Sequence, residues 1–340
     1  MRRELADGPL PPVTAEPVLE VRNLSVEFRT RDGVVHAVNG VSYDVHQGET
    51  LAVLGESGSG KSVTAQAVLG LLDSPPAYVT GGEVRYRGED VLTLSEKQRQ
   101  YLRGRRIAIV FQDALSALNP VFSVGDQIAE MYRVHDGLPR GEARRRAIEM
   151  MERVHIPSAR HRYGDYPHQF SGGMRQRIMI AMALALGPDV LLADEPTTAL
   201  DVTVQAQIME LLVELQRANA MALVLITHDL GVVADVADRI AVMYAGRVVE
   251  SGAVRDLYRR PAHPYTQGLL RSVPRVDQKG KELTPIAGSP PDPAHIPPGC
   301  PFHPRCGYAR QRCREEEPLL RTVGIGRVAA CHYAEEVLGD

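Results

Sequence analysis

The chain has 340 residues and lacks any apolar run long enough to cross a bilayer. Its longest such run, residues 178–186, is well short of the ~20 residues that a membrane-spanning helix requires. Residues 1–4 are followed by proline and glycine rather than an apolar stretch, so no signal peptide is predicted. A formal net charge of -3 gives no broad basic surface, so nucleic acid is not expected as a partner.

Cysteine is scarce and confined to one region. The four cysteines are Cys300, Cys306, Cys313 and Cys331. Cytosolic thiols are kept reduced, which disfavours disulfides. The surrounding segment is rich in proline, so we expect it to bury little hydrophobic core of its own. Four thiolates in such a segment suit a metal centre that stabilises its fold. Their spacing matches neither common zinc knuckles nor ferredoxins, and it does not choose the metal. His303 and His332 are alternative metal ligands, but we expect both to be ordinary loop residues.

A glycine-rich segment follows an apolar run of strand length, residues 50–54, and precedes a helix-like run, residues 63–69. It fits the pattern G-x-x-x-x-G-K-[ST], which in this context predicts a phosphate-binding loop. Its residues are Gly55, Glu56, Ser57, Gly58, Ser59, Gly60, Lys61 and Ser62. The glycines let backbone N–H groups turn toward phosphate oxygens. Lys61 would contact the β- and γ-phosphates of ATP, and the Ser62 hydroxyl would bind Mg²⁺.

A second motif is the continuous apolar strand 190–193, which ends in Asp194 and Glu195. Such a strand is typical of a parallel sheet buried on both faces, whose ligands bind beyond the carboxyl ends of the strands. Asp194 is therefore predicted to hold Mg²⁺, and Glu195 to act as the general base that polarises the attacking water.

The third motif is Ser171-Gly172-Gly173-Met174, about twenty residues before the acidic strand. Ser171 is a good helix N-cap, and the two glycines expose N–H groups at the positive end of the helix dipole. One chain already has one phosphate loop, so this second anion site predicts contact with the γ-phosphate of ATP bound by a partner.

Together these motifs resemble the nucleotide-binding subunit of an ABC transporter. The resemblance implies a head-to-tail pair with each nucleotide between one phosphate loop and the partner's signature. It also implies roles for four further residues. These are the Q-loop Gln112, which touches Mg²⁺ and the attacking water, the D-loop Asp201, the switch His228, and Phe28, which stacks on adenine. Phe170 and Met174 depart from the commoner Leu and Gln, which points to a subfamily.

The C-terminal region narrows the resemblance. The segment 260–266 (Arg-Pro-Ala-His-Pro-Tyr-Thr) and the cysteine-bearing segment from Cys300 to Cys331 look like the extension of ATPases that serve oligopeptide, dipeptide and nickel importers. In that group the four cysteines are associated with an iron–sulfur cluster, which the resemblance implies is [4Fe-4S]. Zinc and thiols that bind no metal are the alternatives.

The predicted fold is an α/β P-loop NTPase core with a parallel sheet, an antiparallel β subdomain and a helical subdomain, followed by a small metal-binding extension. We expect a flexible segment at 1–17, the nucleotide-binding domain at 18–255 with its helical subdomain at about 113–178, and the extension at 256–340. The basic stretch 140–146 is expected to be a solvated helix face. No internal repeat is visible, so one cassette is present.

The resemblance implies an ATPase that energises peptide import at the cytoplasmic face of the membrane. Its partners would be a second, related ATPase subunit in a heterodimer, two membrane permease subunits and an extracytoplasmic solute-binding protein. Two alternatives remain open. One is an importer of nickel or another solute, and the other is an ABC ATPase without a membrane partner, although those usually have two cassettes or a long coiled-coil insertion.

Overall fold

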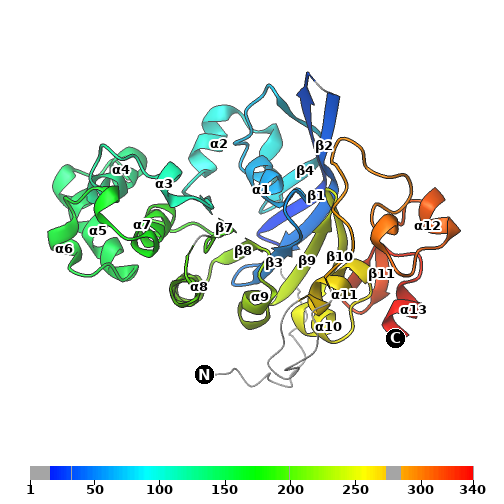
Figure 1. Cartoon of the computed structure of the whole chain (residues 1–340). Coiled ribbons are helices and arrows are strands. Elements are labelled where there is room, and N and C mark those ends of the chain that lie inside the picture. Colours follow the sequence, from blue (N-terminus) through cyan, green and yellow to red (C-terminus); the bar gives the residue numbers. More distant parts are fainter. Residues whose placement is uncertain (1–15, 32, 199, 273–284, 340) are drawn as a thin grey trace. The chain divides into compact units, whose positions relative to one another are not determined.

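The computed structural model describes residues 16–31, 33–198, 200–272 and 285–339 (Figure 1). The chain forms two compact units. The first comprises residues 16–93 and 227–339 of the described chain, and the second comprises residues 94–226. Most of the predicted flexible segment 1–17, namely residues 1–15, lies outside the described residues.

An antiparallel sheet begins the first unit. Its strands, in the order β2-β1-β4-β5, are β2 (Gly33–Val45), β1 (Leu19–Thr30), β4 (Ala77–Tyr86) and β5 (Glu89–Asp90). Leu19 lies opposite Val45 on one side and Tyr86 on the other. Apolar residues such as Leu19 and Val21 are buried, whereas Arg22 is exposed, because successive side chains of a strand point to opposite faces. The predicted antiparallel β subdomain is confirmed.

The first unit also contributes five strands to a mixed sheet. In spatial order they are β11 (Arg321–Gly324), β12 (Arg327–Ala329), β10 (Arg247–Ala253), β9 (Arg239–Tyr244) and β3 (Thr50–Leu54). β3 and β9 are parallel, and the other neighbours are antiparallel. Glu250 of β10 lies opposite Ala329 of β12, so the C-terminal extension continues the sheet of the core.

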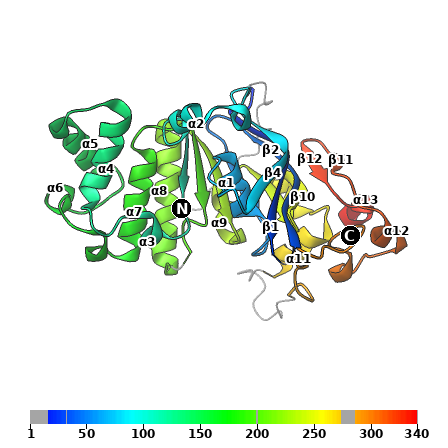
Figure 2. The same ribbon diagram turned by 90° about the horizontal axis from the view of Figure 1, so that it is seen from above.

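Short helices connect the strands of the first unit. They are α1 (Lys61–Val68), η1 (Val91–Thr93), α9 (Leu230–Val236), α10 (Val254–Arg259), α11 (Pro264–Arg271), η3 (His303–Arg305), α12 (Gln311–Glu315) and α13 (Ala334–Gly339). Figures 1 and 2 show α12 and α13 beside the β11–β12 hairpin. The extension buries more than its proline content predicts. Phe302 is 3% exposed and packs against Tyr244 and Tyr265, with ring centroids 5.2 and 5.4 Å away. The expectation of little core in this segment is therefore wrong.

The second unit contains the parallel strands β8 (Ala222–Thr227, whose last residue falls in the first unit), β7 (Val190–Asp194) and β6 (Ile107–Val110), in that order. Val190 lies opposite both Ile107 and Ala222. Every residue of β7 is buried, which confirms the buried parallel strand predicted from its unbroken apolar sequence.

Helices make up most of the second unit. They are α2 (Glu96–Leu102), α3 (Ala114–Ala117), α4 (Val124–Asp136), α5 (Arg140–Arg153), α6 (Ala159–Arg162), η2 (Pro167–Gln169), α7 (Gly172–Leu184) and α8 (Val202–Asn219). On α5, Arg145 forms exposed ion pairs with Glu142 and Glu149, as expected of a solvated helix face. Among the residues that the structure describes, no helix is both long and apolar enough to cross a membrane.

Candidate functional site

The phosphate loop lies in the first unit, between β3 and α1. Lys61, the first residue of α1, is only 5% exposed. Its Nζ donates hydrogen bonds to the carbonyl oxygens of Gly55 (2.8 Å) and Glu56 (2.9 Å). The ammonium group is thereby held under the loop that it follows. A cation in this position can attract phosphate oxygens held by the loop's N–H groups.

Two glycines are required by this conformation. A Cβ on Gly55 would lie 2.3 Å from the Met243 carbonyl oxygen, and one on Gly60 would lie 2.4 Å from that of Ala37. Gly60 also has a φ of +96°, which L side chains rarely adopt. Since both obstacles are backbone atoms, they cannot rotate away.

Glu56, the second residue of the loop, is held by the C-terminal part of the chain. Its N–H donates to the Tyr265 hydroxyl (2.9 Å), and its carboxylate accepts two hydrogen bonds from Arg305 (2.7 and 3.0 Å). Sequence reasoning quoted the segments that contain Tyr265 and Arg305 but assigned neither residue to the loop.

The predicted base and the Q-loop glutamine meet in the second unit. Gln112 Nε2 donates to Glu195 Oε2 (3.3 Å), and Thr198 Oγ1 donates to the same oxygen (2.9 Å). Glu195 has a φ of +44°, which is rare for a residue with a side chain. Asp194, at the end of β7, is 4% exposed. Parallel strands β6 and β7 end beside each other, so the residues that follow them are brought together.

The signature loop also lies in the second unit. Ser171 is the N-cap of α7, and its hydroxyl accepts a hydrogen bond from the Met174 N–H (3.4 Å), as predicted. Gly173 has a further reason to be glycine, because a Cβ there would lie 2.5 Å from Val204 Cγ1 on α8. A Cβ on Gly172 would meet Leu200 Cδ2 at 3.4 Å. Gly173 therefore serves the close packing of α7 against α8, whereas a Cβ on Gly172 would make an ordinary contact.

The remaining predicted residues have simpler surroundings. Asp201 caps α8 by accepting from the Val204 N–H (2.9 Å), whereas Ala199 before it lies outside the described residues. His228 is exposed and directly follows β8. Phe28 is half-buried on β1, opposite Val35 and Ala77.

All four cysteines have free thiols. The Cys300 N–H donates to the Cys313 carbonyl (2.8 Å). Burial, together with the neighbouring thiols, raises the pKa of Cys300 to about 12 and that of Cys331 to about 11. Cys331 belongs to an apolar cluster with Ala262, Ala329 and Ala334, whereas Cys300 and Cys306 pack against the cluster that contains Phe302.

The packing of the cysteines in two apolar clusters bears on the predicted metal centre. Among the described residues, no group of three or more His, Cys, Asp or Glu side chains is arranged to hold a metal ion. The prediction that the extension contains a formed metal site is therefore not supported by the arrangement of its thiols. In number and chemical type they do suit a thiolate-bound metal.

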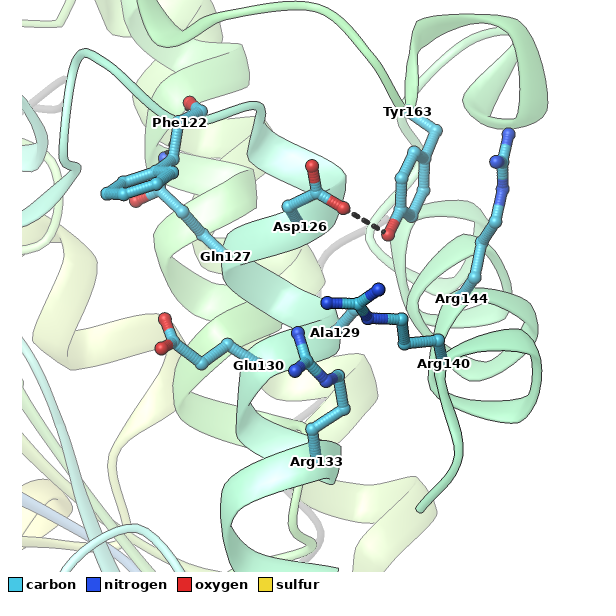
Figure 3. Close-up of a pocket in the computed structure, with 9 residues that line it drawn as sticks. All are labelled: Phe122, Asp126, Gln127, Ala129, Glu130, Arg133, Arg140, Arg144 and Tyr163. Carbon is cyan, nitrogen blue, oxygen red and sulfur yellow. Dashed lines mark hydrogen bonds between the residues drawn. The ribbon is translucent and has the colours of Figure 1, made fainter. Parts of the chain in front are cut away.

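A groove of about 470 Å³ lies within the second unit (Figure 3). It is lined by Phe122, Asp126, Gln127, Ala129, Glu130, Arg133, Arg140, Arg144 and Tyr163. The Tyr163 hydroxyl donates to Asp126 (2.8 Å), and Arg144 lies 4.6 Å from the centre of the Tyr163 ring. Figure 3 shows Arg133 and Arg140 extending toward one another in the groove.

Two family models match this chain. Residues 38–198 match the family model "ABC transporter", and residues 249–313 match "Oligopeptide/dipeptide transporter, C-terminal region". The dipeptide transport ATP-binding protein DppD of Bacillus subtilis is 55% identical over 291 residues, which cover 86% of this chain and 87% of that protein. The oligopeptide transport ATP-binding protein OppD of Salmonella typhimurium is 49% identical over 327 residues, 96% and 97% of the two chains. This chain belongs to the oligopeptide/dipeptide family of ABC transporter ATP-binding proteins.

Solved structures of ABC proteins support the same assignment. The ATP-binding cassette MJ0796, in a dimeric post-hydrolysis state with ADP and Pi, superposes with a TM-score of 0.62 at 28% identity, covering 70% of this chain and 99% of that one. CbiO1 of Clostridium perfringens, part of an ABC transporter complex, gives 0.61 at 31% identity, with coverages of 72% and 92%. The predicted family resemblance is confirmed, and the match to the C-terminal region confirms its oligopeptide/dipeptide branch.

Proposed function

We propose that this chain is the ATP-hydrolysing subunit of an importer for dipeptides or oligopeptides, bound to the cytoplasmic face of the membrane. The observation that carries the proposal is the combination of an intact phosphate loop, with Lys61 seated beneath it, and the Gln112–Glu195 pair. Identities of 49–55% to transport ATP-binding proteins across both core and extension favour peptides as the solute. Nickel or another solute is the alternative within the family.

In the proposed reaction, the phosphate loop and Lys61 bind the phosphates of ATP. Glu195 accepts a proton from the attacking water. Gln112, which is hydrogen-bonded to Glu195, orients that water. His228 contacts the γ-phosphate, and Phe28 stacks on adenine. The Ser62 hydroxyl and the Asp194 carboxylate are the oxygen ligands that suit Mg²⁺, which when bound neutralises phosphate charge.

Two chains cooperate in this scheme. Ser171, Gly172 and Gly173 bind the γ-phosphate of ATP on the partner, and Asp201 lies at the dimer interface. The exposed N–H groups at the start of α7 supply the chemistry, and the dimeric cassette with ADP and Pi is a structural precedent. ATP shifts the pair toward closure only by its difference in affinity for the closed and open states. A related but distinct ATPase is the proposed partner.

The groove in the second unit is the proposed docking site for a cytoplasmic segment of a permease subunit. Phe122 is 57% exposed, and Arg133 and Arg140 form no ion pair within the described chain. An apolar side chain with two unpaired arginines suits a segment that carries both apolar and acidic residues. Two permeases and an extracytoplasmic solute-binding protein would complete the importer.

The four thiols are proposed to hold a metal centre, [4Fe-4S] in preference to zinc. Support comes from their number, their free state and their confinement to one extension. Bound metal would offset the cost of ionising the buried Cys300 and Cys331 thiols, whose pKa values are raised. Anaerobic protein should contain about four irons per chain. Protein that contains zinc and no iron would favour the alternative.

Anaerobic co-purification of the tagged chain from membranes of its native host tests the proposed function. We expect two integral membrane proteins and a second ATPase to be retained. Recovery with ribosomes or DNA-associated proteins, and without membrane proteins, would instead support a non-transport ABC ATPase.

A further inference from the structure

The C-terminal extension contacts the phosphate loop at one residue, Glu56. Three groups hold this residue. The Tyr265 hydroxyl accepts from its N–H, Lys61 donates to its carbonyl oxygen, and Arg305 binds both oxygens of its carboxylate. Only the Lys61 contact is local, since Tyr265 and Arg305 are 209 and 249 residues further along the chain.

Arg305 is built into its position rather than resting on the surface. Its side chain is 5% exposed. Besides the two bonds to Glu56, its Nε donates to the Ala287 carbonyl (3.0 Å) and its Nη1 to the Tyr244 hydroxyl (3.4 Å). The guanidinium carbon lies 5.9 Å from the centre of the Phe302 ring. A planar guanidinium held on several sides fixes the direction of its two-bond contact with a carboxylate, which a lysine cannot reproduce.

The segment that presents Arg305 is itself fixed. Arg305 ends η3, between Cys300 and Cys306. The His303 ring interacts with the Cys300 carbonyl through Nδ1 (2.9 Å), and Cys300 is bonded through its N–H to Cys313. Gly299 has a φ of +69°, and a Cβ there would lie 2.5 Å from the Cys313 carbonyl oxygen. The cysteine-bearing segment thus places Arg305 through several backbone contacts.

A cavity of about 90 Å³ lies where the loop and the extension meet. Residues 56–59 of the loop line one part of it, and Pro290, Pro291, Pro293 and Ile296 of the extension line another. The extension therefore flanks the loop at a second place.

We infer that Arg305 is a positioning residue, through which the cysteine-bearing extension holds the phosphate loop in its ATP-binding conformation. The inference rests on the proposed function of this loop. It adds that ATP affinity depends on a contact from outside the nucleotide-binding core. The extension acts on nucleotide binding through Glu56.

The test compares Arg305→Ala, Arg305→Lys, Glu56→Gln and Tyr265→Phe with wild type. We expect Arg305→Ala and Glu56→Gln each to raise KM for ATP by about tenfold, with a much smaller change in kcat, because the contact orders the loop rather than the reacting water. Arg305→Lys should recover only part of the loss. Tyr265→Phe removes a single acceptor and should have a smaller effect. The double variant Arg305→Ala/Glu56→Gln should be no worse than either single variant, since both remove the same contact.

Arg310→Ala is the matched control, because it breaks an exposed arginine–carboxylate pair with Glu336 in the same extension. It should leave KM unchanged. If Arg305→Ala and Glu56→Gln fold normally and bind ATP as wild type does, the inference is overturned while the proposed function stands.

Hydrogen exchange in the absence of nucleotide supplies a readout that does not depend on ATPase activity. Amide protection of residues 55–60 should fall in Arg305→Ala and not in Arg310→Ala. If the wild-type protein had no ATPase activity, the proposed function would be overturned. Exchange would then decide the positioning role by itself, because unchanged protection contradicts it.

Discussion

The phosphate loop and the signature loop are both glycine-rich turns at the start of a helix, yet they are held in different ways. In the signature loop the support is local, since Ser171 caps its own helix and Gly173 packs against Val204 on α8. In the phosphate loop, Glu56 is bound by Arg305, 249 residues away. Similar anion-binding turns can therefore depend on their own helix or on a distant part of the chain.

The largest expected effect is the loss of ATP hydrolysis when the predicted base, which lies outside both loops, is removed. Glu195→Gln keeps the hydrogen bond with Gln112 possible but removes the base, so ATP hydrolysis should fall by at least ~100-fold while ATP binding persists. ATPase rates and binding of labelled ATP measure the two effects. Glu149→Gln, on the exposed face of α5, is the control. Near-normal turnover in Glu195→Gln would refute the assignment of the base.

Alanine substitution of one glycine in each loop tests whether the two loops are supported differently. Gly60→Ala would place its Cβ 2.4 Å from a backbone oxygen at a φ of +96°, whereas Gly173→Ala would meet only the Val204 side chain. We expect Gly60→Ala to abolish ATP binding. Gly173→Ala should cost about 1–3 kcal/mol of stability, which Val204→Ala should restore.

Thermal unfolding and ATP binding would measure these outcomes. Gly141→Ala is the control, since nothing lies within 4 Å of its Cβ position. Equal losses at the two glycines, or failure of Val204→Ala to rescue, would show that the loops are not supported differently.

Substitution of Arg327 tests how firmly the extension is attached to the core. Arg327 and Glu250 form an ion pair at 2.6 Å, with side chains 9% and 0% exposed. Arg327→Met leaves the buried Glu250 carboxylate without its cation and should destabilise the protein by about 3–5 kcal/mol. Arg310→Ala should cost about 0–1 kcal/mol, because that pair is exposed. Urea unfolding would compare them, and equal costs would contradict this role for Arg327.

The effect that is smallest near neutral pH is a pH dependence of stability. His263 accepts the Tyr265 N–H on Nδ1 (3.1 Å), and burial lowers its pKa from 6.5 to about 3. Between these values the unfolded chain binds a proton that the folded chain does not. The free energy of unfolding should therefore fall as the pH falls from 6.5 toward 3, by at most ~1.4 kcal/mol per pH unit.

His263→Asn keeps an acceptor at the N-cap of α11 and removes the titrating ring. Its stability should depend less on pH over this range than that of wild type, whereas the exposed His295→Asn should behave as wild type. Identical slopes in His263→Asn and wild type would exclude this histidine as the cause.

The predictable parts of the molecule were those set by short stretches of sequence. The antiparallel alternation in β1, the buried strand β7 and the Ser171 cap each follow from neighbouring residues. The Arg305–Glu56 contact could not be read in this way, because it depends on the fold bringing together segments 249 residues apart. Likewise, the confinement of the cysteines to one region predicted one local site. In the structure Cys331 packs in a different apolar cluster from Cys300, although neighbouring thiols contribute to the raised pKa of both.

Peptide uptake by the purified importer in proteoliposomes tests the central claim most directly. ATP is supplied on the side of the membrane that carries this chain, and the solute-binding protein on the other side. The complex should then transport a labelled dipeptide to the ATP side. Uptake should fall sharply when this subunit carries Glu195→Gln. Uptake that is unaffected by this substitution, or accumulation of nickel but not of peptides, would contradict the claim that ATP hydrolysis by this chain drives peptide import.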